Sequence, residues 1–436
     1  MAFPIALQNL MNSLVNLADT VMIGRLGTVE IAAVGIGNNV FFLYNIVLFG
    51  ICSGGAIFTA QFWGKGDIPG IRRNTGFCLL LAIILGLMFT AAVFFIPEEI
   101  MGIYSRDPAV IKAGGVYLHT LALSFIPFAI GQVFFLSLRS IEKLKLPMYC
   151  TFVALGINVG LNYLLIFGIG PFPTMGVEGA ALGTVCARLT EAVLLVAISY
   201  GRKYALAGTV WEMTGFNRFY VGRFLRVCLP VILNEIIWST GITTQNIIFA
   251  RSGTEAIAAF NITNTFSQLT WALFIGLGNG VAILIGKKIG AGDQAGARDY
   301  AARIIRFAPM IACGAVLVLV PLSRFLPVIF NVNDTVLSAA GVMLVILSIS
   351  YPFRAFNMSM VVGICRAGGD TVFCTIYDTV FMWFLALPLA AAASYFFHAP
   401  SPLIYLCLNS EESCKCFLGL WRYRSGKWLH NVIEGI

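Results

Sequence analysis

The chain has 436 residues, of which 59% are hydrophobic and only 11% are charged, and its mean hydropathy is +0.87. Soluble domains carry about 25% charged residues, so this composition excludes an ordinary soluble protein and indicates an integral membrane protein. The net charge of +8 does not indicate a nucleic-acid partner, because the basic residues lie in short loops between apolar segments, where a lipid bilayer is the expected partner.

Twelve apolar stretches are long enough to cross a bilayer as helices. In chain order they cover residues 2–23, 31–60, 75–96, 114–137, 148–169, 178–200, 227–250, 256–286, 307–330, 336–364, 372–397 and 402–420. Apolar runs of about 20 residues favour an all-α membrane protein over a β-barrel, whose strands are short and alternate in polarity. The last stretch is the least apolar, because Glu411, Glu412 and Lys415 lie in its second half.

Lysine and arginine are distributed unequally between alternate loops. One set of alternate loops, together with the C-terminal tail, holds 21 of these residues, and the opposite set holds five. The positive-inside rule therefore predicts a multi-pass protein of the plasma or inner membrane with both termini in the cytoplasm. The two remaining basic residues, Arg188 and Arg354, lie inside apolar stretches.

The second half of the chain repeats the first. The segment RLGTVEIAAVGIGN, Arg25 to Asn38, aligns with RSGTEAIAAFNITN, Arg251 to Asn264, at an offset of 226 residues. Six spans in each half predict two six-helix lobes of parallel topology, related by a pseudo-twofold axis along the membrane normal. We therefore expect an amino-terminal lobe over residues 1–200, a cytoplasmic linker over 201–222, a carboxy-terminal lobe over 223–421 and a cytoplasmic tail over 422–436.

Two acidic residues lie within the predicted spans. Asp19 lies six residues before Arg25, about 9 Å below the outer surface, and Glu235 lies nine residues after Arg226, about 13 Å into the membrane. A carboxylate at the bilayer centre costs about 2.5 to 3.5 kcal/mol on insertion scales, so it usually faces a cavity, a partner or an ion. Both acids can bind a proton or a cation. Asp19 could instead be a carboxylate that is neutralised by nearby amides and packed for helix association, and Glu235 could instead be a protonated acid hydrogen-bonded within its bundle.

Other polar residues within the spans have simpler or open interpretations. Arg188 and Glu191 are three residues apart on one predicted helix and are expected to form an ion pair. Arg354 has no acidic neighbour in sequence, and neither Arg354 nor Asp378 receives a role.

Several stretches resemble the multidrug and toxic compound extrusion (MATE) family. They are PIALQNLMNSLVNLADTVMIGRLGTVEIAAVGIG, LPVILNEIIWSTG, INVGLNYLLIFGIGPFPTMGVEGAALGTV, RAGGDT and RYRSGKW. The resemblance covers nearly the whole chain. It implies a twelve-helix, two-lobe secondary antiporter that expels organic cations and other amphipathic compounds in exchange for Na⁺ or H⁺. We expect a monomer with no cofactor beyond the coupling ion.

The resemblance places the amino-lobe cation site on one acid and three amide or hydroxyl side chains, Asp19, Asn158, Asn162 and Thr184. Some relatives have an acid at the position of Asn162, so the choice between Na⁺ and H⁺ stays open here. The helix-seven acid of the family falls on Glu235, which is expected to bind substrate or a proton. An acid that some relatives carry on helix ten is replaced by Asn357. Asp370 in RAGGDT is expected to cap the start of a helix.

A cavity for cationic drugs should be mostly apolar with a few polar groups, and aromatic faces bind cations with about 0.5 to 2 kcal/mol each. The candidates for this lining are Trp238, Trp271, Phe266 and Gln268. The plainer interpretation for each aromatic residue is a place in the core or against lipid.

Two other functions are weighed against the exporter. A lipid-linked oligosaccharide flippase of the same superfamily would favour a basic cavity, but only Arg188 and Arg354 lie within spans. A membrane-embedded prenyl transferase needs paired carboxylates that hold a metal ion, and the sequence has no DDxxD-like cluster. The sequence also lacks HExxH, GxSxG and Walker patterns, so we do not expect an enzyme.

Overall fold

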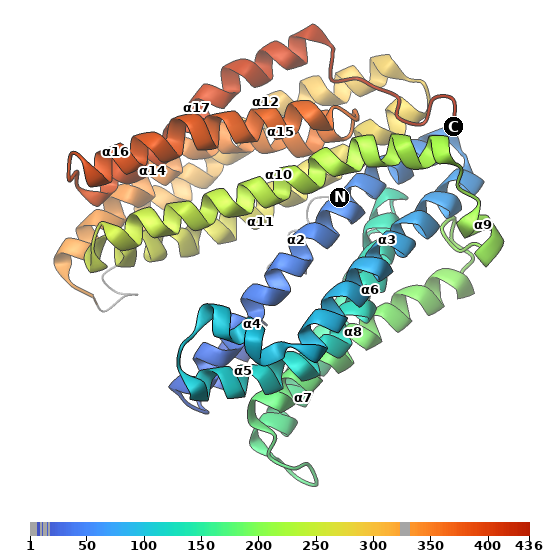
Figure 1. Cartoon of the computed structure of the whole chain (residues 1–436). Coiled ribbons are helices and arrows are strands. Elements are labelled where there is room, and N and C mark those ends of the chain that lie inside the picture. Colours follow the sequence, from blue (N-terminus) through green and yellow to red (C-terminus); the bar gives the residue numbers. More distant parts are fainter. Residues whose placement is uncertain (1–6, 9–10, 12–14, 16–17, 323–331) are drawn as a thin grey trace. The chain divides into compact units, whose positions relative to one another are not determined.

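The computed structural model describes the chain apart from residues 1–6, 9–10, 12–14, 16–17 and 323–331. Every regular element of the described part is helical, as the predicted fold class requires (Figure 1). Eight helical stretches in that part are long and apolar enough to cross a membrane. The predicted span 2–23 falls largely outside the described residues, and within its range residues 18–23 are helical.

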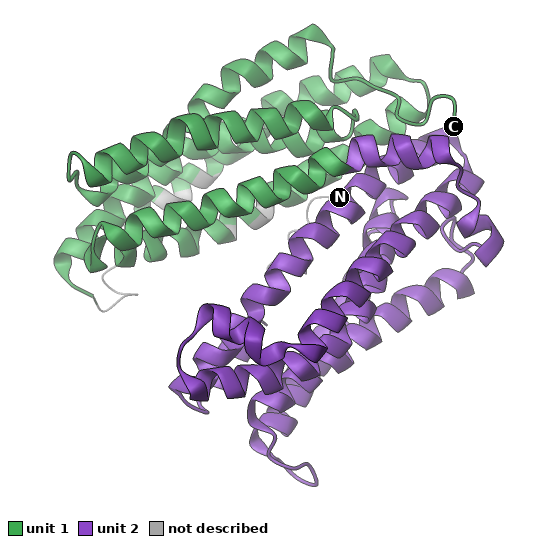
Figure 2. Cartoon of the chain, in the orientation of Figure 1, with its two compact units in different colours: residues 1–3, 229–436 green, residues 4–228 purple. Residues whose placement is uncertain are grey.

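The residue contacts divide the chain into two compact units (Figure 2). In chain order, the first unit ends at Cys228 and is unit 2, purple, in the figure, and the second unit begins at Leu229 and is unit 1, green. The helices of the first unit are α2 (Thr28–Lys65), α3 (Ile68–Phe95), α4 (Pro97–Tyr104), α5 (Pro108–Leu121), α6 (Phe125–Ser140), α7 (Lys145–Phe167), α8 (Gly176–Gly201) and α9 (Val210–Thr214). A short 3-10 turn, η1 (Ala122–Ser124), joins α5 to α6 within the predicted span 114–137.

Helix α10 (Arg218–Arg251) contains the boundary between the units. The second unit continues with α11 (Thr254–Gly290), α12 (Gln294–Leu322), α14 (Asp334–Met358), η3 (Ser359–Arg366), α15 (Thr371–Phe381), η4 (Met382–Ala386), α16 (Leu387–Tyr395) and α17 (Ser401–Ser425). Both η3 and η4 are π-helical, so the predicted spans 336–364 and 372–397 are not uniform α-helices. Such π-helical turns often lie at functional sites.

The helix starts repeat with the same 226-residue offset as the sequence. The pairs are Thr28 with Thr254, Ile68 with Gln294, Pro108 with Asp334, and Lys145 with Thr371. An aspartate precedes each helix of the second pair and accepts a hydrogen bond from a backbone N–H of that helix. Asp67 accepts from the Gly70 N–H at 2.8 Å, and Asp293 accepts from the Gly296 N–H at 2.8 Å. These carboxylates satisfy backbone donors that a helix start leaves free. The two units therefore share one helix plan.

The segment predicted as a linker, residues 201–222, packs against the first unit. Helix α9 lies on α3, where Arg72 Nη1 donates to Glu212 Oε1 at 2.6 Å. The Tyr220 hydroxyl donates to Asn74 Oδ1 at 2.7 Å, and the Tyr220 ring makes an edge contact with Phe77. These contacts join the segment to the first unit.

Candidate functional site

The first candidate site surrounds Asp19 in the first unit. Asn162 on α7 is 1% exposed, and its Nδ2 donates to Asp19 Oδ1 at 2.8 Å. Asn158, one helical turn earlier on α7, has its amide 3.2 Å from both carboxylate oxygens of Asp19. The amide orientation that satisfies both groups points the nitrogen of Asn158 at Asp19. The Asp19 carboxylate is thus held by two amide N–H donors from one face of α7.

Thr184 brings α8 to the same place. Its Oγ1 lies 3.4 Å from the Asn158 side-chain amide and donates to the Ala180 carbonyl oxygen at 3.0 Å. Gly183, the preceding residue, lies so close to Asn162 that a Cβ there would collide with the Asn162 amide oxygen. The structure therefore brings together all four side chains that the resemblance assigned to the cation site.

The donor set around Asp19 suits a small cation. Asn162 Oδ1 is buried and accepts no hydrogen bond from the residues that the structure describes. Carboxylate, amide and hydroxyl oxygens are the ligands that hard cations prefer. Asp19, Asn162 and Thr184 could each supply one such oxygen, whereas a proton would need only an oxygen of Asp19.

The predicted pair of Arg188 and Glu191 is confirmed. Arg188 Nη1 donates to Glu191 Oε2 at 3.3 Å, and the Arg188 guanidinium lies over the Phe128 ring at 4.6 Å from its centroid. Thr151 donates to the other Glu191 oxygen at 2.7 Å and accepts a hydrogen bond of 2.6 Å from Gln8. Arg188 is therefore paired with Glu191 within the first unit, and it is also near enough to Asp19 for its charge to act on that carboxylate.

Glu235 has a partner that its sequence neighbourhood did not reveal. Arg366, at the end of η3, donates to Glu235 Oε1 at 2.7 Å and to Asn234 Oδ1 at 2.6 Å. The Arg366 side chain is 8% exposed and that of Glu235 is 17% exposed. Glu235 is thus one half of a buried ion pair, and its role in binding substrate or a proton stays a prediction.

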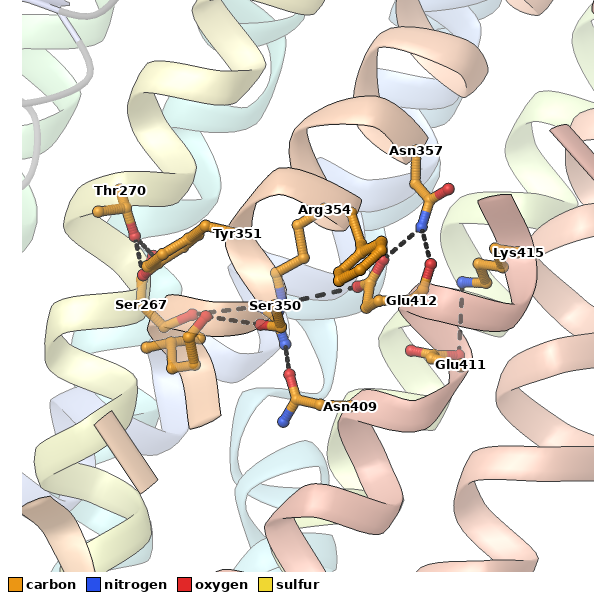
Figure 3. Close-up of polar contacts among 12 residues, drawn as sticks. Ser267, Thr270, Ser350, Tyr351, Arg354, Asn357, Asn409, Glu411, Glu412 and Lys415 are labelled. Atoms are coloured by element: carbon orange, nitrogen blue, oxygen red, sulfur yellow. Dashed lines mark hydrogen bonds and ion pairs between the residues drawn. The ribbon is translucent and has the colours of Figure 1, made fainter. Parts of the chain in front are cut away.

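Asn357 and Arg354, both on α14, contact the acidic middle of α17 (Figure 3). Asn357 Nδ2 donates to Glu412 Oε2 at 2.8 Å, and Asn357 Oδ1 accepts from the Tyr377 hydroxyl at 2.7 Å. Arg354 Nε lies 3.7 Å from Glu412 Oε1, and its Nη2 donates to Asn409 Oδ1 at 2.7 Å. A carboxylate from α17 therefore lies beside Asn357, where some relatives carry the acid on helix ten.

The aromatic candidates are only partly brought together. Trp238 on α10 and Trp271 on α11 stack with ring centroids 5.9 Å apart and planes 7° apart. Phe266 is buried at 9% exposure, whereas Gln268 is exposed. The tryptophan stack can form an aromatic wall in the second unit, and the role of Gln268 stays a prediction.

The prediction that the Asp370 side chain caps the start of a helix was wrong. Asp370 occupies the N-cap position of α15 but its side chain makes no capping hydrogen bond. Instead its two oxygens accept from Arg422 at 2.7 and 2.9 Å. A bidentate bond to a guanidinium is stronger than one to a neutral backbone N–H, so the carboxylate turns toward α17.

Sequence reasoning does not find four functional candidates, namely Arg366, Glu411, Glu412 and Lys415. Arg366 was counted among the loop residues, although it is 6% exposed in the structure. In the sequence, Glu411, Glu412 and Lys415 only make the last predicted span less apolar than the others. Their place inside an otherwise apolar stretch was the signal that could have identified them.

Comparisons with known proteins agree with this architecture. The MatE family model matches residues 4–164 and 230–408, two segments whose starts are 226 residues apart. A protein of Thermotoga maritima, named probable multidrug resistance protein NorM, is 24% identical over 98% of this chain and 92% of its own length. The multidrug resistance protein PmpM of Pseudomonas aeruginosa is 24% identical over 89% of this chain and 82% of its own length.

A solved structure shows the same fold. A mutant of the Vibrio cholerae MATE transporter VcmN matches with a TM-score of 0.90 at 17% identity, covering 99% of this chain and 96% of that one. Structures of this kind have twelve membrane helices in two lobes, as predicted for this chain. This chain therefore belongs to the multidrug and toxic compound extrusion (MatE) family, a family of multi-span membrane transporters and not of enzymes.

Proposed function

We propose that this chain is a secondary active multidrug exporter, which expels organic cations and amphipathic drugs in exchange for H⁺ or Na⁺. The observation that carries this proposal is the gathering of Asn158 and Asn162 at Asp19, with Thr184 3.4 Å from the Asn158 amide. Asn162 donates to the carboxylate at 2.8 Å, and the Asn158 amide lies within 3.2 Å of both its oxygens. The names of the relatives support small drugs as substrates.

The proposed mechanism uses the charge of Asp19. A bound proton or Na⁺ neutralises the carboxylate and favours one arrangement of the helices around it, whereas the substrate favours the other. Such a difference in binding between two states is what coupling requires. Asp19, Asn162 and Thr184 would hold the ion through oxygen atoms, and the ion would supply only positive charge.

The substrate contacts belong to the second unit in this proposal. Trp238 and Trp271 offer aromatic faces to an organic cation, and Glu235, Asn357 and Gln268 offer polar groups. The protein acts in the plasma or inner membrane with both termini in the cytoplasm, as the excess of basic residues in one set of loops predicts. It works as a monomer with no cofactor beyond the coupling ion.

Transport of ethidium into inverted membrane vesicles tests the proposal. A pH gradient and a Na⁺ gradient are imposed separately, and vesicles without the protein serve as the control. One of the two gradients should drive accumulation of ethidium. The proposal is refuted if neither gradient drives accumulation of ethidium, or of a fluoroquinolone used as a second probe, although the protein is present in the membrane.

A further inference from the structure

The middle of α17 carries charged residues in a place where a membrane helix rarely tolerates them. Glu411 lies ten residues after Ser401, about 15 Å along the helix axis, which is near the centre of α17. Glu411 and Lys415 are each 6% exposed. Ionisable groups at such depth persist only with partners or a function.

These residues belong to a polar network within the second unit, and Figure 3 shows two parts of it, the Glu411–Lys415 pair and the contacts of Glu412 with Arg354 and Asn357. Lys415 Nζ lies 3.4 Å from Glu411 Oε2 and 3.4 Å from Asp378 Oδ1 on α15. The other Asp378 oxygen accepts a hydrogen bond of 3.1 Å from Asn234 on α10. Asn234 also accepts from Arg366, which connects Lys415 and Asp378 to the Glu235 pair.

The other end of the network reaches Glu412. The Tyr377 hydroxyl lies 2.8 Å from the Lys415 carbonyl oxygen and 2.7 Å from Asn357 Oδ1. Asn357 in turn donates to Glu412, the partner of Arg354. The network therefore runs without a break from Arg354 to Glu235 through α14, α17, α15 and α10.

The charges in this network do not balance. Its cations are Arg354, Arg366 and Lys415, and its carboxylates are Glu235, Asp378, Glu411 and Glu412. Arg354 pairs with Glu412 and Arg366 pairs with Glu235, so Asp378 and Glu411 share Lys415. One negative charge is left over when all groups are ionised, and an uncompensated buried charge is strongly unfavourable.

Glu411 is the member least well held as an anion. Lys415 Nζ lies 3.4 Å from one oxygen of each carboxylate, Glu411 and Asp378, but among the described residues only Asp378 has a second donor, the Asn234 amide at 3.1 Å. The charged and titratable groups around Glu411 are Glu412 and Lys415 on α17, Asp378 and Tyr377 on α15, and Arg354 on α14. Helices α11, η4 and α16 also pack on α17, and their ionisable residues lie at helix ends, namely Glu255, Lys287, Lys288 and Tyr395.

We propose that Glu411 and Asp378, on either side of Lys415, form a binding site for one exchangeable proton, carried by Glu411. A proton needs one carboxylate oxygen and neutralises the excess charge. A metal cation would be repelled by the Lys415 ammonium, and the described residues contain no group of three or more His, Cys, Asp or Glu side chains placed to hold one. This site lies in the second unit, is separate from Asp19, and does not depend on the proposed export activity.

Infrared difference spectroscopy of the full chain in lipid nanodiscs, recorded as the pH is changed, tests this site. All samples carry Asp19→Asn, which removes the carboxyl group of the other proposed ion site, and this parent chain should show the C=O stretch of one protonated carboxyl group that disappears as the pH rises and shifts in heavy water. Glu411→Gln should lose that signal. Glu191→Gln is the matched control, because Glu191 is also buried at 8% exposure but has Arg188 to itself, and it should keep the signal.

Two further variants make the test independent of how well Glu411→Gln folds. Asp378→Asn leaves Lys415 to Glu411 alone and should also remove the signal, although Glu411 is still present. Lys415→Met removes a cation and should give two protonated carboxyl groups in place of one. An Asp19→Asn parent chain without the signal, a signal that persists in that background in both Glu411→Gln and Asp378→Asn, or a signal removed by Na⁺ at constant pH would each overturn the proposal.

Discussion

Substitution of Arg366 by methionine tests whether the buried pair with Glu235 stabilises the second unit. The Arg366 guanidinium donates to Glu235 Oε1 at 2.7 Å and to Asn234 Oδ1 at 2.6 Å, and its side chain is 8% exposed. Methionine fills a similar apolar volume but cannot donate. The variant leaves the Glu235 carboxylate buried without its cation.

The expected cost follows from that burial. Removing one partner of a buried ion pair lowers the free energy of unfolding by about 3 to 5 kcal/mol, mainly because the other charge is left uncompensated. The double variant Arg366→Met with Glu235→Gln removes that charge and should be more stable than the single variant. Arg303 is the matched control, because it pairs with Asp299 at 2.8 Å with side chains 65% and 54% exposed. Such surface pairs contribute about 0 to 1 kcal/mol.

Equilibrium unfolding in mixed micelles with increasing dodecyl sulfate, followed by circular dichroism, measures these free energies. The expected order of stability is wild type close to Arg303→Met, then the double variant, then Arg366→Met. An equal loss of unfolding free energy in Arg366→Met and Arg303→Met would refute the reasoning. A double variant no more stable than Arg366→Met would show that the cost comes from lost packing rather than from the buried charge of Glu235.

Three further predictions concern other parts of the chain. Asn162→Ala removes the 2.8 Å hydrogen bond to Asp19, and a hydrogen bond to a charged acceptor contributes about 1.5 to 3 kcal/mol. The coupling-ion concentration that gives half-maximal efflux should therefore change at least about tenfold. An unchanged concentration would contradict this. Trp428→Ala opens a cavity at a side chain that is 1% exposed and should lower the free energy of unfolding in the same assay by about 3 to 5 kcal/mol, and a loss below about 1 kcal/mol would contradict its burial. The Thr209 backbone N–H holds the pKa of Glu212 below its usual 4.5, so the stability that Glu212 contributes is present above that pH and is lost as the pH falls through the lowered pKa. Glu212→Gln should therefore have a lower melting temperature than the wild type at neutral pH and the same melting temperature at strongly acidic pH. An equal difference in melting temperature at both pH values would contradict this.

Much of the fold could be predicted because it depends on local patterns. Long apolar runs predict membrane helices, and the 226-residue repeat predicts that Thr28 and Thr254 begin equivalent helices, as they do. The π-helical turns at Ser359–Arg366 and Met382–Ala386 could not be predicted. They depend on how neighbouring helices pack and leave no mark on hydrophobic periodicity.

The candidate sites show the same division between local and distant contacts. Arg188 and Glu191 are three residues apart on one helix, so their pair could be predicted. Arg366 and Glu235 are 131 residues apart, and only the fold brings them together. The four residues around Asp19 came from the family resemblance, because spacing alone does not show that α7 and α8 meet at that carboxylate.

Asp370 shows why a local rule can fail. An aspartate before a helix usually accepts from the first backbone N–H groups, and Asp370 does precede α15. Arg422, 52 residues later, offers two charged donors instead. The stronger distant partner overrides the local preference, which no pattern around Asp370 could reveal.

Ion-driven transport by Asp19→Asn, reconstituted in proteoliposomes, tests the central claim that Asp19 couples the ion to export. Asparagine is close in shape and permanently uncharged, and Asp19→Glu keeps an ionisable group as the control. Asp19→Asn should bind ethidium as the wild type does but should lose accumulation driven by the pH or Na⁺ gradient, whereas Asp19→Glu should keep part of it. Accumulation by Asp19→Asn against a gradient at the wild-type level would contradict the account and assign coupling to another residue.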